Sequence, residues 1–168
     1  LSSGVRLVEI PVQSPAAFAT IREASARVGN DPSRFIGAGT ITSTRLLADA
    51  TDAGAEFLVC PDLREDVLKE ADARAIPCLP GVATATESGL ALDLGHSWQK
   101  AFPASSLGTG WAAAIHGPMP SVRFVATGGI ASSNASAFLA AGYSAVAVGS
   151  AASTREKIDV ILSRLLEI

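Results

Sequence analysis

The feature that most limits how this 168-residue chain can fold is a repeat in which strand-like and helix-like segments alternate. Ala- and Leu-rich stretches with helical spacing, for example 15–28, 43–54 and 63–75, separate short β-rich segments. Because several of the β-rich segments are nearly continuous apolar runs, we expect strands buried on both faces of a parallel sheet, joined by right-handed βαβ units. The expected strands are 6–12, 34–40, 56–61, 75–81, 97–103, 122–129 and 144–150.

Local signals support these boundaries. Thr84 followed by Glu87 fits a capping box at the start of a helix. Gly54 and Gly142 each follow a helical segment, where a glycine ends a helix. The final stretch, 153–168, has the pattern of an amphipathic closing helix.

Seven strand–helix units predict a (β/α)8 TIM barrel that lacks one unit. The chain opens on "LSSGVRLVEI", which has the pattern of a helix end, a glycine stop and a strand. We therefore expect a single barrel domain over 1–168 that is incomplete at its N-terminus, with the first strand and most of its helix missing. The alternative is an open doubly wound sheet that binds ligand at a switch point. No G-x-G-x-x-G follows the first strand, which disfavours a dinucleotide fold.

Composition excludes several classes of function. The net charge is −3 and no basic run occurs, so nucleic acid is not an expected partner. No apolar run approaches the roughly 20 residues of a membrane span. Cys60 and Cys78 lie in apolar strand-like segments, which favours free thiols in a reducing cytosol over a disulfide. Two histidines and two cysteines at these spacings predict no zinc site, and we expect no metal.

The ends of the expected strands carry most of the candidate functional residues, because parallel barrels place their active sites at the carboxyl ends of the strands. His96 and His116 fall at helix ends instead, where a structural role is expected. The candidates at or near strand ends are Glu9, Gln13, Thr40, Pro61, Lys100, Thr127, Gly128, Gly129, Gly149 and Ser150.

Lys100, one of only three lysines, lies inside an expected strand. Side-chain alternation puts Trp98, Lys100 and Phe102 on one face. If that face points into the barrel, aromatic rings surround the ammonium, and its partial desolvation lowers the pKa. A neutral amine can attack a carbonyl carbon and form a Schiff base. The alternatives are a lysine that snorkels to solvent, or a core ion pair, for example with Glu9.

Glu9 and Thr40 are candidates of a second kind. An acidic residue in the apolar segment "LVEIPV" is unfavourable to bury, which fits a general acid or base or, alternatively, a strand-end residue that points to solvent. Thr40 ends "GAGT" and either presents its hydroxyl to a substrate carboxylate or caps the next helix, while the two glycines could serve packing alone.

The glycine-rich ends of the last two strands, "TGGI" and "VGS", are the position of the usual phosphate site in this barrel. Glycines let the backbone approach an anion closely. The alternative is two ordinary tight turns.

Seven stretches of the sequence, taken in order, resemble the class I aldolases of 2-keto-3-deoxy-6-phosphogluconate and 2-keto-3-deoxy-6-phosphogalactonate. They are "LVEIPVQSP", "IGAGTI", "LVCPDL", "PCLPGVATATE", "KAFPAS", "VRFVATGGI" and "VAVGS". The resemblance implies that the protein reversibly cleaves one of these phosphorylated keto acids to pyruvate and glyceraldehyde 3-phosphate, without a metal or other cofactor. It makes Lys100 the Schiff-base lysine and Glu9 the catalytic glutamate.

The resemblance also implies the binding residues. Thr40 contacts the pyruvate carboxylate, Pro61 lines the site, and Phe102 lies beside the lysine. The implied phosphate-binding residues are Gly128, Gly129, Gly149 and Ser150.

One departure bears on the substrate. The gluconate enzymes carry an arginine where this chain has Gln13, whereas the galactonate enzymes have an amide there and share a stretch similar to "CLPGVATATE". The galactonate branch is therefore favoured. The resemblance also implies a homotrimer, and the free cysteines favour a cytoplasmic location. The alternatives are a 4-hydroxy-2-oxoglutarate aldolase of the same family, a non-catalytic sugar-phosphate-binding barrel, and an isomerase that uses acid–base chemistry alone.

Overall fold

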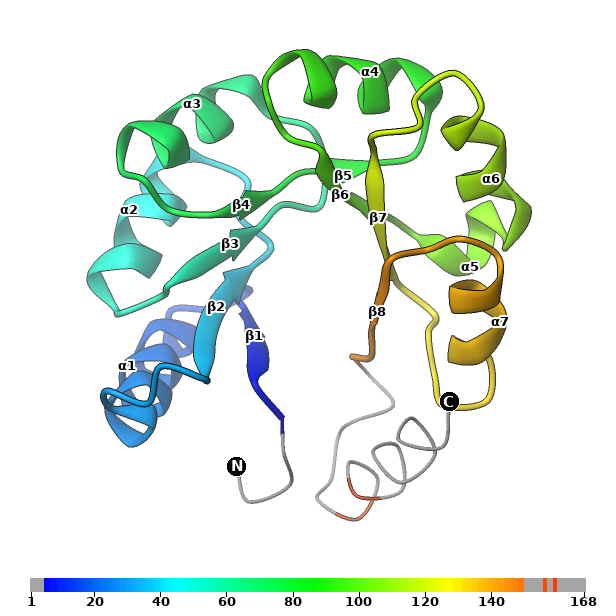
Figure 1. Ribbon diagram of the computed structural model, residues 1–168. Coiled ribbons are helices and arrows are strands. Elements are labelled where there is room, and N and C mark those ends of the chain that lie inside the picture. Colours follow the sequence, from blue (N-terminus) through cyan, green and yellow to red (C-terminus); the bar gives the residue numbers. More distant parts are fainter. Residues whose placement is uncertain (1–4, 150–155, 157–158, 160–168) are drawn as a thin grey trace. The chain divides into compact units, whose positions relative to one another are not determined.

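The computed structural model describes residues 5–149, 156 and 159, and the chain divides into two compact units, Leu1–Pro80 and Gly81–Ile168. Each unit consists of a parallel sheet with helices on one side of it (Figure 1). The parallel βα arrangement confirms the α/β class predicted from the alternating pattern.

The first unit contains a four-stranded sheet in the order β1-β2-β3-β4, with every neighbouring pair parallel. Its strands follow the expected segments, although β3 is shorter than 56–61. Helices alternate with the strands, and the Ser43 hydroxyl caps α2 by accepting from the Leu46 N–H at 3.2 Å. The elements are β1 (Leu7–Pro11), α1 (Ala16–Val28), β2 (Phe35–Gly39), α2 (Thr44–Asp52), β3 (Phe57–Val59), α3 (Glu65–Ala73) and β4 (Cys78–Leu79).

The core of this unit lies between its sheet and its helices. Ile36 and Leu58 from the strands pack with Ile21 and Leu47 from the helices. Burying these apolar side chains supplies most of the favourable free energy of folding. Because side chains alternate along a strand, the odd-numbered residues of β1, β2 and β3 point away from this core.

Two thiols lie in the same core. Cys60 and Cys78 are free, as predicted, and their Sγ atoms lie 3.6 Å apart. The thiol–thiol hydrogen bond and burial both hold the pKa of Cys78 well above its usual range. Since the thiolate is the reactive form, the raised pKa makes Cys78 a poor nucleophile.

The second unit contains a parallel sheet in the order β5-β6-β7-β8. The predicted capping box is confirmed, because the Thr84 hydroxyl accepts from the Glu87 N–H and the Glu87 carboxylate accepts from the Thr84 N–H. Gly54 and Gly142 end their helices with φ of 98° and 96°, as expected of helix stops. The elements are β5 (Gly81–Val82), α4 (Ala85–Asp93), β6 (Trp98–Ala101), α5 (Ala104–Leu107), α6 (Gly110–His116), β7 (Arg123–Thr127), α7 (Ala135–Ala140) and β8 (Ala145–Ala147).

The segment 75–81 differs from the prediction of one continuous strand. It forms β4 and β5, which are separated by the buried Pro80. Proline has no N–H to donate to a strand ladder, so the pairing is interrupted there. The closing helix expected over 153–168 lies outside the described residues, apart from Glu156 and Asp159.

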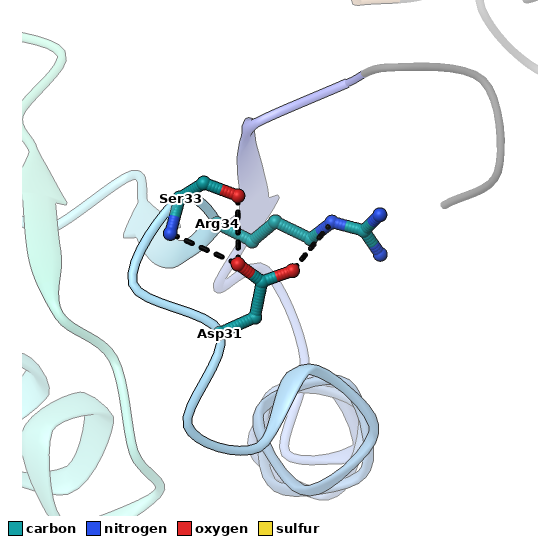
Figure 2. Close-up of polar contacts among 3 residues, drawn as sticks. All are labelled: Asp31, Ser33 and Arg34. Atoms are coloured by element: carbon teal, nitrogen blue, oxygen red, sulfur yellow. Dashed lines mark hydrogen bonds and ion pairs between the residues drawn. The ribbon is translucent and has the colours of Figure 1, made fainter.

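A charged turn connects α1 to β2 (Figure 2). Asp31 Oδ1 accepts from the backbone N–H of Ser33 at 3.0 Å and from its hydroxyl at 2.7 Å. Asp31 Oδ2 lies 3.1 Å from Nε of Arg34. The Ser33 hydrogen bonds, with a smaller contribution from Arg34, lower the pKa of Asp31.

This turn predicts a stability effect that depends on pH. The folded-state pKa of Asp31 lies below its unfolded value, so the carboxylate stabilises the fold at neutral pH and this contribution is lost as the pH falls below about 4. Asp31→Asn should therefore lower the melting temperature slightly at pH 7 and have a smaller effect near pH 3, measured by circular dichroism. A difference of the same size at both pH values would contradict this role.

Candidate active site

The two faces of the second sheet carry different chemistry. Gln99 points to the helical side, where its amide group donates to the carbonyl oxygens of Ser88 at 2.9 Å and His96 at 3.0 Å. The Ser88 hydroxyl donates to Gln99 Oε1 at 2.6 Å. Because neighbouring residues alternate, Lys100 projects from the opposite face, together with Val125 of the adjacent strand.

Lys100 is buried on that face. Its residue is 6% exposed, and its Nζ lies 4.5 Å from the centre of the Phe102 ring. The alternative of a lysine that snorkels to solvent is therefore wrong. The expected aromatic surroundings are confirmed for Phe102 but not for Trp98, which is 44% exposed and stacks with the guanidinium of Arg123.

Phe102 links the lysine to the first glycine of the "TGGI" turn. A Cβ added to Gly128 would lie 3.0 Å from the Phe102 ring and 3.2 Å from Cα of Pro103. The second glycine, Gly129, lies closer still to Ser105, whose side chain would overlap an added Cβ. The second unit therefore brings together four of the predicted site residues, namely Lys100, Phe102, Gly128 and Gly129.

In the first unit, Glu9 lies at the middle of β1, on the face that points away from the helices. Its carboxylate crosses the next strand directly over Gly39, so that a Cβ at Gly39 would collide with it. Glu9 is half-buried and its carboxylate lies against the sheet, which favours the acid–base candidate over a residue that points to solvent. In the same way, a Cβ at Gly37 would collide with the ring of Phe57.

Thr40 follows β2 with φ of 61°, a left-handed conformation that is unfavourable for a β-branched residue. It does not cap α2, since Ser43 does so. Strained backbone of this kind concentrates at functional sites, where the surrounding structure enforces it. Pro61 follows β3 and is half-buried, whereas Gln13 follows β1 and is exposed.

The remaining predicted residues contribute less. Gly149 is exposed after β8, and Ser150 lies outside the described residues. His116 is the last residue of α6 and hydrogen-bonds the Val122 carbonyl at 3.0 Å, in keeping with the structural role expected of it. Among the residues that the structure describes, no three acidic, histidine or cysteine side chains gather as metal ligands would. The described helices include none that is long and apolar enough to cross a membrane.

Comparison with known proteins identifies the family. The family model of KDPG and KHG aldolases matches residues 1–161. The chain belongs to the KDPG and KHG aldolase family. It is 39% identical over 141 residues to the KHG/KDPG aldolase of Escherichia coli K12. That match covers 83% of this chain and 65% of the relative, so the chain spans slightly less than two thirds of the length of this curated protein.

Solved structures of the aldolase family have the same fold. A KDPG aldolase from Legionella pneumophila, captured with pyruvate as a covalent carbinolamine, aligns with a TM-score of 0.86 and 26% identity. A native KDPGal structure aligns with a TM-score of 0.89 and 27% identity. Both matches cover 99% of this chain and 82% of the other, and they confirm the barrel class predicted from the sequence.

Sequence reasoning missed two residues that hold the "TGGI" turn. Ser105 and Asn134 both hydrogen-bond the two-glycine segment, through the Ser105 backbone N–H and the Asn134 side chain. Their sequence contexts gave little signal, since a serine after "KAFPA" resembles an ordinary first-turn residue and Asn134 an ordinary N-cap.

Proposed function

We propose that this aldolase-family chain cleaves a 2-keto-3-deoxy-6-phospho sugar acid to pyruvate and D-glyceraldehyde 3-phosphate through a Schiff base on Lys100. The observation that carries the proposal is the environment of Lys100. The residue is 6% exposed, and it contacts Phe102, which in turn packs on Gly128 of the proposed phosphate turn. Burial favours the neutral amine, which is the form that attacks a ketone.

The proposed reaction starts with attack of Lys100 Nζ on the C2 ketone, which gives a carbinolamine. Glu9 donates a proton to the departing hydroxyl, and loss of water leaves a protonated imine. Glu9, or a water that it holds, then removes the proton of the C4 hydroxyl. The C3–C4 bond breaks, and its electron pair moves into the iminium to give an enamine as the aldehyde leaves. Protonation of C3 and hydrolysis release pyruvate and restore the amine.

The binding residues follow from the family resemblance. Thr40 would present its hydroxyl to the carboxylate, and Pro61 would line the pyruvate pocket. The positive φ at Thr40 supports this role, because functional sites retain such conformations. The phosphate would bind at backbone N–H groups beside Gly128 and Gly129, completed by Gly149 and Ser150. Holding the phosphate far from C2 and C4 positions the chain for cleavage.

For the substrate, we favour the galactonate epimer, because Gln13 stands where the gluconate enzymes have arginine. A 4-hydroxy-2-oxoglutarate activity is the second candidate, since the Escherichia coli relative is named a KHG/KDPG aldolase. Assays with both epimers and with 4-hydroxy-2-oxoglutarate, compared by kcat/KM, separate these substrates. We further propose that residues 1–168 belong to a single barrel domain and that the protein acts in the cytoplasm as a homotrimer.

Borohydride trapping tests the chemistry. Incubation with pyruvate and sodium borohydride should attach a reduced pyruvate adduct to Lys100, located by peptide mass spectrometry. Lys69 is the internal control, because its side chain is 67% exposed, pairs with Glu65 and should stay unmodified. Omission of pyruvate should remove the adduct. A protein that binds phosphorylated ligands without any adduct on Lys100 would instead be a non-catalytic binding barrel or an acid–base isomerase.

A further inference from the structure

The turn Gly128–Gly129, which links β7 to the segment before α7, has an unusual backbone. Both residues have positive φ, 90° and 74°. Glycine adopts this region without a steric penalty, but it also rotates readily out of it. A turn made of two such residues keeps one shape only if other groups hold its peptide planes.

Two groups hold the carbonyls of this turn. The backbone N–H of Ser105 donates to the Gly128 carbonyl at 3.0 Å. The side-chain amide of Asn134 donates to the Gly129 carbonyl at 2.9 Å. In a trans peptide, the C=O and the following N–H point in opposite directions. Fixing these carbonyls therefore directs the N–H groups of Gly129 and Ile130 away from Ser105 and Asn134.

Asn134 also holds the far side of the turn. Its Oδ1 accepts from the N–H of Ala131 at 2.9 Å. The one side chain thus bridges the carbonyl before Ile130 and the N–H after it, although it does not cap α7. Ile130 itself is buried, which anchors the segment between the two contacts. Among the described residues, the N–H groups of Gly129 and Ile130 donate to no backbone carbonyl.

We propose that Asn134 is the positioning residue of the phosphate turn. This inference rests on the proposed function, in which the N–H groups beside Gly128 and Gly129 bind the substrate phosphate. Without Asn134, the peptide between Gly129 and Ile130 is free to flip, and a flipped carbonyl would face the phosphate in place of an N–H. Asn134 touches no reacting atom, so it sets affinity for the phosphate and leaves the chemistry at the lysine unchanged.

The test compares a phosphate-dependent and a phosphate-free reaction of the same protein. Asn134→Ala should raise KM for the phosphorylated keto acid about tenfold, as expected for loss of about 1.4 kcal/mol of hydrogen bonding. Exchange of the pyruvate methyl protons with deuterated water, followed by NMR, needs the enamine but no phosphate and should be unchanged. Ser133→Ala, a change at the exposed neighbouring residue, is the matched control and should alter neither reaction.

Asn134→Asp provides the conservative comparison. The carboxylate keeps an acceptor for the Ala131 N–H but loses the donor to the Gly129 carbonyl. The rise in KM should therefore be at least as large as in Asn134→Ala. If either Asn134 variant slowed cleavage and proton exchange by the same factor, Asn134 would be merely structural and the inference would be overturned.

A titration with inorganic phosphate separates this inference from the proposed function. In the wild-type protein, the amide NMR signals of Gly129 and Ile130 should shift as phosphate is added. In Asn134→Ala, the same shifts should require an about tenfold higher phosphate concentration. If wild type neither cleaves substrate nor traps pyruvate, the proposed function fails and this titration alone decides the role of Asn134. Equal titration curves for the two proteins would overturn that role.

Discussion

Replacing Lys100 by alanine should abolish aldol cleavage and the borohydride adduct together. No other described lysine is buried, and an iminium on Lys100 is the electron sink for breaking the C3–C4 bond in the proposed reaction. Loss of a covalent nucleophile lowers kcat by several orders of magnitude. A coupled assay for pyruvate release, run beside the trapping reaction, measures both effects. Turnover close to that of wild type would refute the mechanism.

Two further variants show what kind of role Lys100 has. Lys69→Ala removes an exposed lysine paired with Glu65 on α3 and should leave the activity unchanged. Lys100→Arg keeps a positive charge but cannot form an imine. If Lys100 were only an anion contact, the arginine variant would keep affinity for phosphorylated ligands and much of the function. We expect it to be as inactive as the alanine variant.

Replacing Gly39 by alanine should displace the carboxylate of Glu9 without unfolding the protein. The added methyl group would occupy the position of the outer atoms of Glu9, which can rotate away at little expense to the fold. A general acid–base residue contributes about 10²–10⁴-fold to a rate, and a misplacement of about 1 Å can lose 10²-fold. We therefore expect kcat and the proton exchange of pyruvate to fall about 10²-fold, with KM little changed.

The matched control for Gly39→Ala is Gly37→Ala, two residues earlier on the same strand and the same face. Its methyl group would meet the ring of Phe57 instead of a carboxylate. The strain should therefore appear as a lower melting temperature, with kcat of the folded enzyme retained. Equal losses of kcat in the two variants would show that the glycines serve packing alone.

Much of the fold could be predicted from the sequence because it depends on local patterns. Apolar runs marked the strands, and the capping box at Thr84 and Glu87 fixed the start of α4. Two-residue alternation was enough to place Lys100 on the face opposite Gln99, since it requires only that residues 98–101 be a strand. Phe102 follows that strand, and its contact with Lys100 depends on the turn after the strand as well. These predictions needed no knowledge of which segments pack together.

Local patterns could not predict the features that depend on how separate segments pair. The contact of Glu9 with Gly39 requires the register that aligns Glu9 with Gly37, and the contact of Cys60 with Cys78 requires the order β3-β4. The role of Asn134 was hidden because an asparagine before a helix normally caps it. Trp98 was assigned to the surroundings of Lys100 by alternation alone, but the neighbouring strand supplies Arg123 as its partner.

The side-by-side placement of Gln99 and Lys100 has a consequence for how this protein can evolve. Gln99 is held by hydrogen bonds to Ser88 and His96 on the helical side, while Lys100 faces the other way. Substitutions at position 99 are limited by the stability of the packing, and those at position 100 by the chemistry proposed for the lysine. The strand therefore has two interleaved sets of requirements, so residues that face the helices can change with the packing while residues on the other face are kept for the site.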